Sequence, residues 1–264
     1  MKQSKVIVIT GASSGIGRAV AKILCEKGHT VYSFSRRGES APGVISVPCD
    51  VTEEEQIKAA VGQVIADAGR IDVLICAAGF GIAGVSETTP LPLAKKQFDV
   101  NFFGTVSAVS AVLPQMRKQG YGRIVGISSL ASVFPIPFQS FYSASKAALD
   151  AYFFALANEI KPFGITVCCV RPGDTATGFT AAREKSDGTD GYGERSDKSI
   201  ARMEKDEQGG MSAEKVGRTV AKTALKSHSR PFVIPGGTNR LLGFLSKILP
   251  SRMIRKIVGV MYSK

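Results

Sequence analysis

The chain has 264 residues, of which 44% are hydrophobic and 28 are glycine. A chain of this length can bury one sizeable core, so a single α/β domain fits better than two smaller domains. The formal net charge is +12, but no nucleic-acid-reading motif accompanies the basic residues, so nucleic acid is not an expected partner.

Cysteine and histidine usage limits the compartment and the chemistry. The sequence contains five cysteines, Cys25, Cys49, Cys76, Cys168 and Cys169. None forms a CxxC pair and most lie in apolar runs, which predicts a reduced, cytoplasmic protein. Only His29 and His228 are present, so we expect no histidine-rich metal site. The N-terminal run "VIVIT" is too short for a secretory signal, and no later stretch reaches transmembrane length without a charge.

Short β-branched apolar runs alternate with longer amphipathic segments, a pattern typical of a parallel sheet with helices on both faces. The apolar runs predict strands near 5–10, 30–35, 44–48, 72–77, 122–128, 164–170 and 231–235. The amphipathic segments predict helices near 15–28, 53–68, 91–118, 141–161 and 212–227. Pro114 is expected to bend or shorten the end of the third helix.

Residues 180–210 are highly charged, rich in glycine and without a sustained apolar period. A loop of this length in a compact domain is usually a mobile lid or a disordered segment. We therefore expect residues 174–211 to form a substrate lid loop within a catalytic domain that spans residues 1–237.

The stretch "VIVITGASSGIGRAVAKIL" indicates a strand, a glycine turn and a helix, with Gly11, Gly15 and Gly17 spaced as GxxxGxG. Backbone amides at the start of such a helix can face a pyrophosphate, so the turn favours nucleotide binding. The same letters match the GxSxG nucleophile elbow of hydrolases, with Ser13 as the nucleophile. That alternative needs an acid and then a histidine, and only His228 lies far enough along the chain.

The end of the second predicted strand, about 20 residues past the glycines, is where an acid would bind the ribose hydroxyls of NAD. The sequence there is "SFSRR", with Ser35 in the acid's place, followed by Arg36 and Arg37. Arginines at this point can form charge-assisted hydrogen bonds with a 2′-phosphate. The pattern favours NADP over NAD, and a solvated basic turn is the alternative.

Tyr142 and Lys146 stand four residues apart in "SFYSASKAALDAYFFAL", which predicts neighbours on one helix face. A fixed positive charge beside a phenol lowers its pKa from about 10, as a residue that exchanges protons at neutral pH requires. An isolated pair of this kind is more often a packed tyrosine and a lysine that extends to solvent. The other motifs must decide between these interpretations.

Three motifs in order, "TGASSGIG" at 10–17, "YSASK" at 142–146 and "RPG" at 171–173, resemble the short-chain dehydrogenase/reductase family. The resemblance covers residues 1 to about 180 and is specific in combination. It implies an α/β fold with a doubly wound, Rossmann-type parallel sheet of about seven strands. It also implies a nicotinamide cofactor, hydride transfer at a carbonyl or an alcohol, and a homodimer or homotetramer.

The resemblance assigns catalytic roles to four residues. Tyr142 would be the general acid/base, and Lys146 would hold the nicotinamide ribose and lower the pKa of the tyrosine. Ser129 would hydrogen-bond the substrate oxygen, and Asn101 in "DVNFFG" would support a helix carbonyl and a proton-relay water. Taken singly, Asn101 could be a mid-helix polar residue and Ser129 a strand-end cap, but their combination favours catalysis.

Further positions are carried over to the cofactor. Asp50 and Val51 would border the adenine, and Thr177 would lie near the carboxamide and the pyrophosphate. The expected cofactor-binding residues are Gly11, Ser13, Ser14, Gly15, Ile16, Gly17, Arg36, Arg37, Asp50, Val51, Ala77, Ala78, Gly79, Tyr142, Lys146, Pro172, Gly173, Thr175 and Thr177.

One motif departs from the family. Its usual "NNAG" after the fourth strand is "CAAG" here, Cys76 to Gly79, so two amide side chains that brace the central sheet are missing. Backbone contacts with the cofactor need only small residues and can survive. The change therefore puts the rigidity of this turn in question more than the chemistry.

Apolar segments near the motifs predict a hydrophobic substrate pocket. The segments "GFGIAG", "VFPIPF" and the start of the lid supply Phe80, Ile82, Phe134, Ile136, Phe138 and Phe179. The substrate-binding residues that we expect are Phe80, Ser129, Phe134, Ile136, Tyr142 and Phe179. Such walls suit a hydrophobic ketone or alcohol.

The length past Pro235 distinguishes branches of the family. Acyl-carrier-protein reductases tend to end soon after the last strand, whereas this chain continues to Lys264 and so resembles the hydroxysteroid and retinol dehydrogenase branch. A 3-oxoacyl-thioester reductase is the alternative enzyme. A non-catalytic NADP-sensing module is an alternative of another class, which the intact Ser129, Tyr142 and Lys146 disfavour.

The C-terminal extension, residues 238–264, is basic and amphipathic. Its sequence "NRLLGFLSKILPSRMIRKIVGVMYSK" predicts two short helices separated by Pro250, with apolar residues at near-helical spacing and no acid. Such a segment could lie peripherally on an anionic membrane surface through residues 239–264. Alternatively, its apolar face covers the substrate pocket or a subunit contact.

Overall fold

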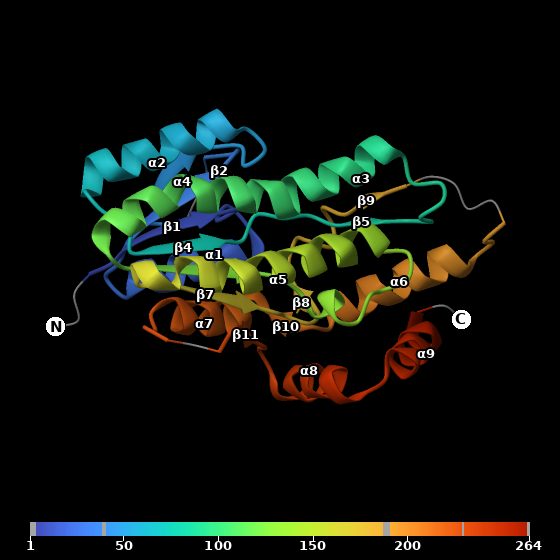
Figure 1. The fold of residues 1–264 in the computed structure, drawn as a ribbon. Coiled ribbons are helices and arrows are strands. Elements are labelled where there is room, and N and C mark those ends of the chain that lie inside the picture. The colour runs from blue at the N-terminus through green and yellow to red at the C-terminus, as the bar shows by residue number, and fades with distance from the viewer. Residues whose placement is uncertain (1–3, 39–40, 187–190, 229, 263–264) are drawn as a thin grey trace.

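The computed structural model describes residues 4–38, 41–186, 191–228 and 230–262. Its main sheet has seven parallel strands in the order β11-β7-β6-β4-β1-β2-β3 (Figure 1). These strands are β1 (Val6–Thr10), β2 (Thr30–Ser35), β3 (Ile45–Pro48), β4 (Val73–Cys76), β6 (Gly122–Ile127), β7 (Ile165–Val170) and β11 (Phe232–Val233). The seven strands predicted from the apolar runs are confirmed, as is the doubly wound α/β fold. Chain order reverses between β1 and β4, and ligands of such sheets bind at the carboxyl ends of the strands beside that reversal.

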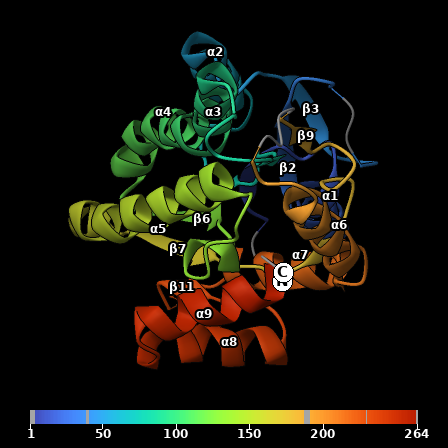
Figure 2. The same ribbon diagram turned by 90° about the vertical axis from the view of Figure 1, so that its right-hand side faces the viewer.

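Helices cover both faces of the sheet because alternate strand residues point to opposite sides (Figure 2). Ile7 and Ile9 of β1 pack with α1 and α7, whereas Val6 and Val8 pack with α2, α4 and α5. The helices concerned are α1 (Gly15–Glu26), α2 (Glu54–Ala68), α4 (Gly104–Gln119), α5 (Ser140–Ile160) and α7 (Ala213–Ala224). The core therefore consists of two apolar layers with the sheet between them.

The third predicted helix contains a local change of winding. It consists of α3 (Leu91–Phe98), a π-helical turn at Asp99–Phe103, and α4. Pro114 lies inside α4, which continues to Gln119 and ends at the left-handed Gly120, so the expected shortening is wrong. A π turn inside a helix is frequent at functional sites, and this one contains Asn101.

The segment expected to be a lid loop contains regular structure. Its helix α6 (Arg195–Gln208) turns one face inward, where Ser196, Ser199, Ile200 and Met203 are buried. The expectation of a long loop is wrong here, because two serines and two apolar residues are too weak an apolar pattern to reveal the helix. The segment also contributes to two small parallel sheets. In one, β8 (Thr175–Ala176) pairs with β10 (Met211–Ser212), and in the other β9 (Glu184–Lys185) pairs with β5 (Ile82–Ala83), which lies earlier in the chain.

The C-terminal extension forms the two predicted helices, α8 (Gly237–Ile248) and α9 (Ser251–Tyr262), on either side of Pro250. They lie together at the lower edge of the molecule in both views (Figures 1 and 2). Gly243 allows α8 to approach the body closely, since a Cβ atom there would lie 2.1 Å from Ile234 Cδ1. On α9, Val258 and Tyr262 pack against Ile200 and Met203 of α6.

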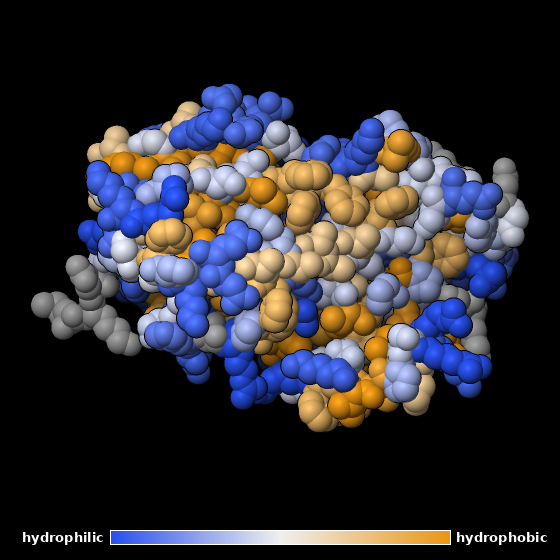
Figure 3. All heavy atoms as spheres, viewed as in Figure 1, coloured by the Kyte–Doolittle hydropathy of each residue, from blue (hydrophilic) through white to orange (hydrophobic). Residues whose placement is uncertain are grey.

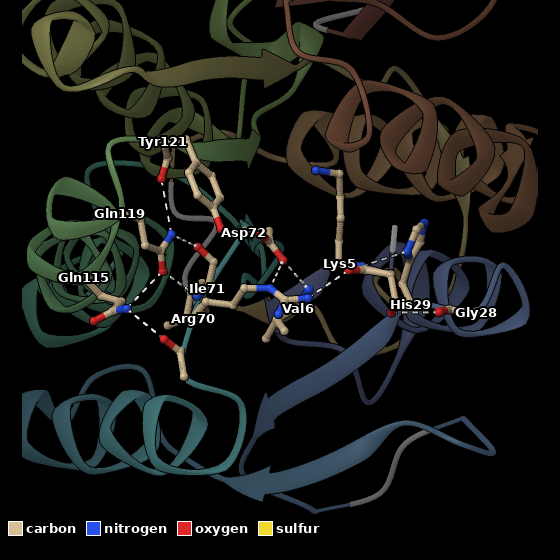
Figure 4. Close-up of polar contacts among 12 residues, drawn as sticks. Lys5, Val6, Gly28, His29, Arg70, Ile71, Asp72, Gln115, Gln119 and Tyr121 are labelled. Carbon is tan, nitrogen blue, oxygen red and sulfur yellow. Dashed lines mark hydrogen bonds and ion pairs between the residues drawn. The ribbon is translucent and has the colours of Figure 1, made fainter. Parts of the chain in front are cut away.

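Polar contacts fix the opposite, amino-terminal ends of β1 and β4 (Figure 4). Asp72 Oδ2 accepts hydrogen bonds from Val6 N at 2.6 Å and from Arg70 Nε at 3.1 Å. Gln119 Oε1 accepts from Ile71 N at 2.9 Å, and Gln119 Nε2 donates to Ile71 O at 2.9 Å. These contacts set the positions of the two strands whose other ends border the cleft.

Candidate active site

A cavity of about 780 Å³ lies at the carboxyl ends of the central strands. Every residue expected to bind cofactor or substrate lines it, including the glycine turn, Arg36 and Arg37, and Tyr142. Asn101 is fully buried behind the wall rather than on it. The fold thus brings together segments from Gly11 to Phe179, about 170 residues apart in the sequence, which parallel strand ends allow.

Two glycines of the turn between β1 and α1 have no room for a side chain. Gly11 has φ +70°, and a Cβ atom there would lie 2.6 Å from Ala78 Cα. A Cβ atom on Gly17 would lie 2.3 Å from Gly11 O. Ser14 caps α1 without a side-chain hydrogen bond to the helix, which leaves its hydroxyl available to a ligand. The turn and the positive helix terminus behind it fit the pyrophosphate of a dinucleotide.

The "CAAG" turn is braced by other residues than the missing amides. Thr10 Oγ1 accepts hydrogen bonds from Ala77 N at 3.2 Å and from Ala78 N at 3.3 Å. Asn101 Oδ1 accepts from Phe80 N at 3.0 Å, and Asn101 Nδ2 donates to Phe80 O at 3.0 Å. The turn that follows β4 is therefore held on both sides.

The adenosine end of the cavity carries the expected charge pattern. Arg36 and Arg37 are exposed, line the cavity and follow the end of β2. Among the described residues neither arginine is in an ion pair. Asp50 is fixed by a hydrogen bond from Thr52 N at 3.0 Å, next to Val51 on the same wall. These residues fit an adenosine whose ribose carries a phosphate.

Tyr142, Ser129 and Lys146 meet at the centre of the cavity. Ser129 follows β6, and its hydroxyl interacts with the phenol of Tyr142. Lys146 lies one turn beyond Tyr142 on α5, with its Nζ atom 5.8 Å from the centre of the tyrosine ring. Lys146 Nζ also donates a hydrogen bond to Ile127 O at 2.9 Å. Strand end and helix together place two hydroxyls and an ammonium around one point.

The pKa of Tyr142 differs from the expected direction. Burial raises it to about 12, the hydrogen bond with Ser129 opposes this rise, and Glu207 and Asp174 add to it. In the chain without a cofactor, the pKa of Tyr142 is therefore raised, and the expected lowering by Lys146 is not observed. The Lys146 ammonium group donates its hydrogen bond to Ile127 O, and its Nζ atom lies 5.8 Å from the centre of the tyrosine ring. Tyr142 is protonated at neutral pH and can donate a proton.

Lys146 has a perturbed pKa in the opposite sense. Its side chain is 6% exposed, and burial lowers the pKa to about 8, while Asp150 and the thiols of Cys169 and Cys76 oppose the change. A buried ammonium with one fixed acceptor retains donors that can bind a polar ligand such as a ribose.

Asn101 is positioned by the π turn, which directs its side chain toward the sheet. Besides Phe80, it contacts Ser145 Oγ at 3.2 Å on α5. Gln97, one turn earlier, is fully buried and donates to Phe80 O at 2.6 Å while it accepts from Ile82 N at 2.9 Å. Sequence reasoning missed Gln97, although its spacing of four residues from Asn101 is a signal that could have indicated it.

The apolar wall is mostly as expected. Phe80, Phe134, Ile136 and Phe179 line the cavity, and the Phe179 ring lies 5.6 Å from the ring of Tyr142. The expectation is wrong for two other residues that the apolar segments supplied. Ile82 is buried in β5, and Phe138 packs against Tyr192, so neither reaches the cavity.

Two carboxylates near Tyr142 had not been anticipated. Glu207 pairs with Arg183 and accepts a hydrogen bond from Thr180 Oγ1 at 2.6 Å. Asp174 faces the cavity, and no basic side chain in the described part of the chain pairs with it. Burial and the neighbouring acids Asp206 and Glu207 raise the pKa of Asp174. The cavity wall close to the phenol therefore carries a carboxyl group that has no cationic partner in the described part of the chain.

The C-terminal helices form one side of the cavity. The lining residues from this part of the chain are Asn239, Leu242, Ile257, Val258, Met261 and Tyr262. The interpretation that the extension covers the substrate pocket therefore has direct support in the structure. Of these residues, Leu242, Ile257 and Met261 are also exposed to solvent, so they stand at the opening.

The fold and the site together define a nucleotide-dependent oxidoreductase, and the comparisons identify its family. A family model for short chain dehydrogenase matches residues 5–188. The chain belongs to the short-chain dehydrogenase/reductase family, whose members are oxidoreductases that use nicotinamide cofactors.

Three similar proteins cover most of the chain. A 3-ketodihydrosphingosine reductase from Bacteroides thetaiotaomicron is 40% identical over 99% of both chains. Dehydrogenase/reductase SDR family member 7B from Xenopus laevis is 31% identical over 94% of this chain and 79% of its own length. The crystal structure of a short-chain dehydrogenase from Streptomyces avermitilis superposes with a TM-score of 0.83 at 30% identity, over 98% of both chains.

Proposed function

We propose that this chain is an NADPH-dependent reductase of long-chain 2-amino ketones of the 3-ketodihydrosphingosine type. The observation that carries the proposal is an apolar cavity in which one unpaired carboxylate, Asp174, lies near the hydroxyls of Tyr142 and Ser129. A single-chain amino ketone carries a hydrocarbon tail, a carbonyl and an adjacent ammonium group. Each of these parts has a counterpart in the cavity, and the relative from Bacteroides bears the name of such a reductase.

NADPH is the cofactor that the residues favour. The glycine turn would hold the pyrophosphate, Arg36 and Arg37 would bind the 2′-phosphate, and Lys146 would bind the nicotinamide ribose. When bound, the nicotinamide supplies the hydride for the carbonyl carbon. The buried Asn101 keeps the turn at Phe80 in place and so fixes the adjacent wall.

Tyr142 is the residue that donates the proton in this proposal. As negative charge develops on the carbonyl oxygen, the hydroxyls of Ser129 and Tyr142 can donate hydrogen bonds to it. Because the pKa of Tyr142 is raised to about 12, the phenol enters the reaction protonated and donates its proton to the oxygen.

Asp174 distinguishes an amino ketone from other hydrophobic ketones. Asp174 is solvent-accessible on the cavity wall and has no cationic partner in the described part of the chain, so its carboxylate is free to pair with a substrate ammonium group next to the carbonyl. Steroid- or retinoid-like substrates lack this charge. A 3-oxoacyl thioester also lacks it. The carboxylate therefore favours an amino ketone over these alternatives.

A homo-oligomer remains part of the proposal. Phe103 and Phe154, on the outer faces of the π turn and α5, are both more than half exposed. Large aromatic side chains at the surface are enriched at interfaces between subunits. Sedimentation velocity of the purified chain tests this expectation, and a monomer at micromolar concentration would contradict it.

The substrate proposal is tested by initial rates with NADPH. The substrates are 3-ketodihydrosphingosine, a 3-ketone of equal chain length without the amine, acetoacetyl thioester and a ketosteroid. The amino ketone should have the highest kcat/KM. Asp174→Asn should lower kcat/KM for it by at least about tenfold, through KM, and leave the amine-free ketone within about twofold. Asp197→Asn, an exposed acid on α6, is the matched control. If Asp174→Asn lowered kcat/KM equally for both ketones, Asp174 would have no role in recognising the amine. A higher kcat/KM for the thioester than for the amino ketone would overturn the proposed substrate class.

A further inference from the structure

The helices α8 and α9 carry a second apolar surface that is turned outward. More than half of the exposed large apolar side chains in the described part of the chain lie here: Leu241, Leu242, Phe244, Ile248, Met253, Ile257, Val260 and Met261. Figure 3 shows hydrophobic side chains along the lower edge of the molecule, over α8, beside strongly hydrophilic ones. Large contiguous exposed apolar patches on a soluble protein mark a surface that binds something.

Each helix presents a narrow stripe. On α8, Leu241, Phe244 and Ile248 are three and four residues apart and point to one side. Their exposure is large, at 59% for Phe244, even though the buried Gly243 on the same helix contacts Ile234. The helix is therefore anchored to the body by one face and leaves a separate apolar stripe uncovered. We name the stripes of α8 and α9 together the C-terminal apolar face.

The charge around this face is of one sign. Arg240, Lys247, Arg252, Arg255 and Lys256 are exposed, and residues 237–262 contain no acid. A stripe of large apolar residues flanked only by Lys and Arg is complementary to an anionic lipid surface, where the apolar side chains enter the acyl boundary and the cations meet headgroups. A second copy of this chain would instead bring equal positive charges together. No helix in the described part of the chain is both long and apolar enough to cross a bilayer.

The face is continuous with the cavity. Leu242, Ile257 and Met261 are exposed and at the same time line the space that holds Tyr142. If this exposed part of the cavity wall lies against a lipid surface, a hydrocarbon chain can enter without passing through water. We infer that α8 and α9 dock this enzyme peripherally on anionic bilayers and admit a lipid substrate from the membrane. The docking stands on the surface alone, whereas the route for the substrate rests on the proposed function.

The absence of tryptophan from the sequence permits a direct test on the full chain. Phe244→Trp on α8 and Met253→Trp on α9 place single reporters on the face. Leu91→Trp is the matched control, because Leu91 is 65% exposed and α3 lies on the opposite side of the molecule (Figures 1 and 2). With vesicles that contain phosphatidylglycerol, the two reporters should shift to the blue and be quenched by brominated lipid, and the control should not change. Vesicles of phosphatidylcholine alone should give a much weaker effect.

Charge and apolar contributions are separated by two variants. Arg252→Glu/Arg255→Glu should lower vesicle affinity at least about tenfold, whereas Lys215→Glu/Lys222→Glu on α7 should change it less than about twofold. Leu241→Ser/Phe244→Ser/Ile248→Ser should abolish co-sedimentation and keep the turnover of a short soluble ketone, because these residues do not line the cavity. Binding by this triple variant as strong as that of the unaltered chain would overturn the inference.

Two further outcomes would also overturn it. One is the absence of any reporter shift with anionic vesicles. The other is a loss of dimers or tetramers in the triple variant together with no vesicle binding by the unaltered chain, which would assign the face to a subunit contact. Because vesicle binding is measured without turnover, a wrong substrate proposal would leave these results unchanged and would show only in the rates with the amino ketone.

Discussion

Replacing Lys146 with methionine tests how much the buried charge of this lysine lowers the free energy of unfolding. The lysine is buried at 6% exposure, and its pKa is lowered to about 8 from 10.5, chiefly by burial. Between these two values the unfolded chain binds more protons than the folded chain, so stability rises with pH across this window. Below pH 8 the charged Lys146 lowers the free energy of unfolding by about 3 kcal/mol, at about 1.4 kcal/mol for each pKa unit.

Methionine has a similar length and no charge, so Lys146→Met removes the destabilisation that the buried charge causes. It also leaves Ile127 O without its donor, which costs roughly 1–3 kcal/mol. At pH 7 the variant should therefore be about as stable as the unaltered chain or up to about 2 kcal/mol more stable. The loss of the ribose contact should abolish activity in the same variant, so function and stability would move in opposite directions.

The pH dependence separates the charge from the hydrogen bond. The free energy of unfolding, measured with urea and without added cofactor, should increase by about 2 kcal/mol more in the unaltered chain than in Lys146→Met between pH 7 and pH 9.5. Lys222→Met, an exposed lysine on α7, should follow the unaltered chain. Parallel curves for Lys146→Met and the unaltered chain would refute the reasoning, because they would mean that Lys146 titrates alike in the folded and unfolded states.

Three other substitutions test separate parts of the site and scaffold. Tyr142→Phe keeps the ring and should lower the hydride-transfer rate at least about a hundredfold in single-turnover measurements while NADPH binding persists; near-normal turnover would exclude Tyr142 as the acid. Arg36→Asp should lower the NADPH/NADH ratio of kcat/KM at least about tenfold, since a charge-assisted bond is worth roughly 1.5–3 kcal/mol; an unchanged ratio would place the phosphate elsewhere. Gln119→Ala should lower the free energy of unfolding in urea by about 1–3 kcal/mol, because Ile71 N loses its acceptor. The KM for NADPH should not change. An unchanged free energy of unfolding would contradict the structural role given to the hydrogen bonds between Gln119 and Ile71.

The parts of the fold that the sequence predicts well are those in which one residue pattern repeats. The β-branched runs of the main sheet and the apolar stripes of the long helices bury many side chains each, so their period survives in the sequence. The strands β5, β8, β9 and β10 have two residues each and no such period. They form because two neighbouring segments meet, which depends on the finished fold.

In the candidate site, too, residues in recurring motifs can be predicted, and residues placed by the finished fold cannot. Residues in fixed motifs, such as Tyr142, Lys146 and the glycine turn, are found from spacing, and the structure brings them to one cavity. Asp174 and Glu207 lie near Tyr142 only because α6 and the segment after β7 fold over it. Their carboxylates are ordinary charged residues in the sequence, where nothing distinguishes a cavity wall from a solvated loop. The direction of the pKa shift at Tyr142 depends on this burial and was unpredictable for the same reason.

The helix α6 explains why the extension cannot be treated as a removable anchor. Its buried residues Ile200 and Met203 pack against Val258 and Tyr262 of α9, and Tyr262 donates a hydrogen bond to Asp206 at 3.4 Å. Glu207 at the end of α6 in turn pairs with Arg183, which lies over the Phe179 ring beside Tyr142. Removal of the extension would therefore expose α6, loosen Glu207 and disturb the wall next to the phenol. Loss of activity in a truncated chain would then follow whether or not the extension binds lipid, and only substitutions on the outward stripes separate the inner, structural face from the outer face.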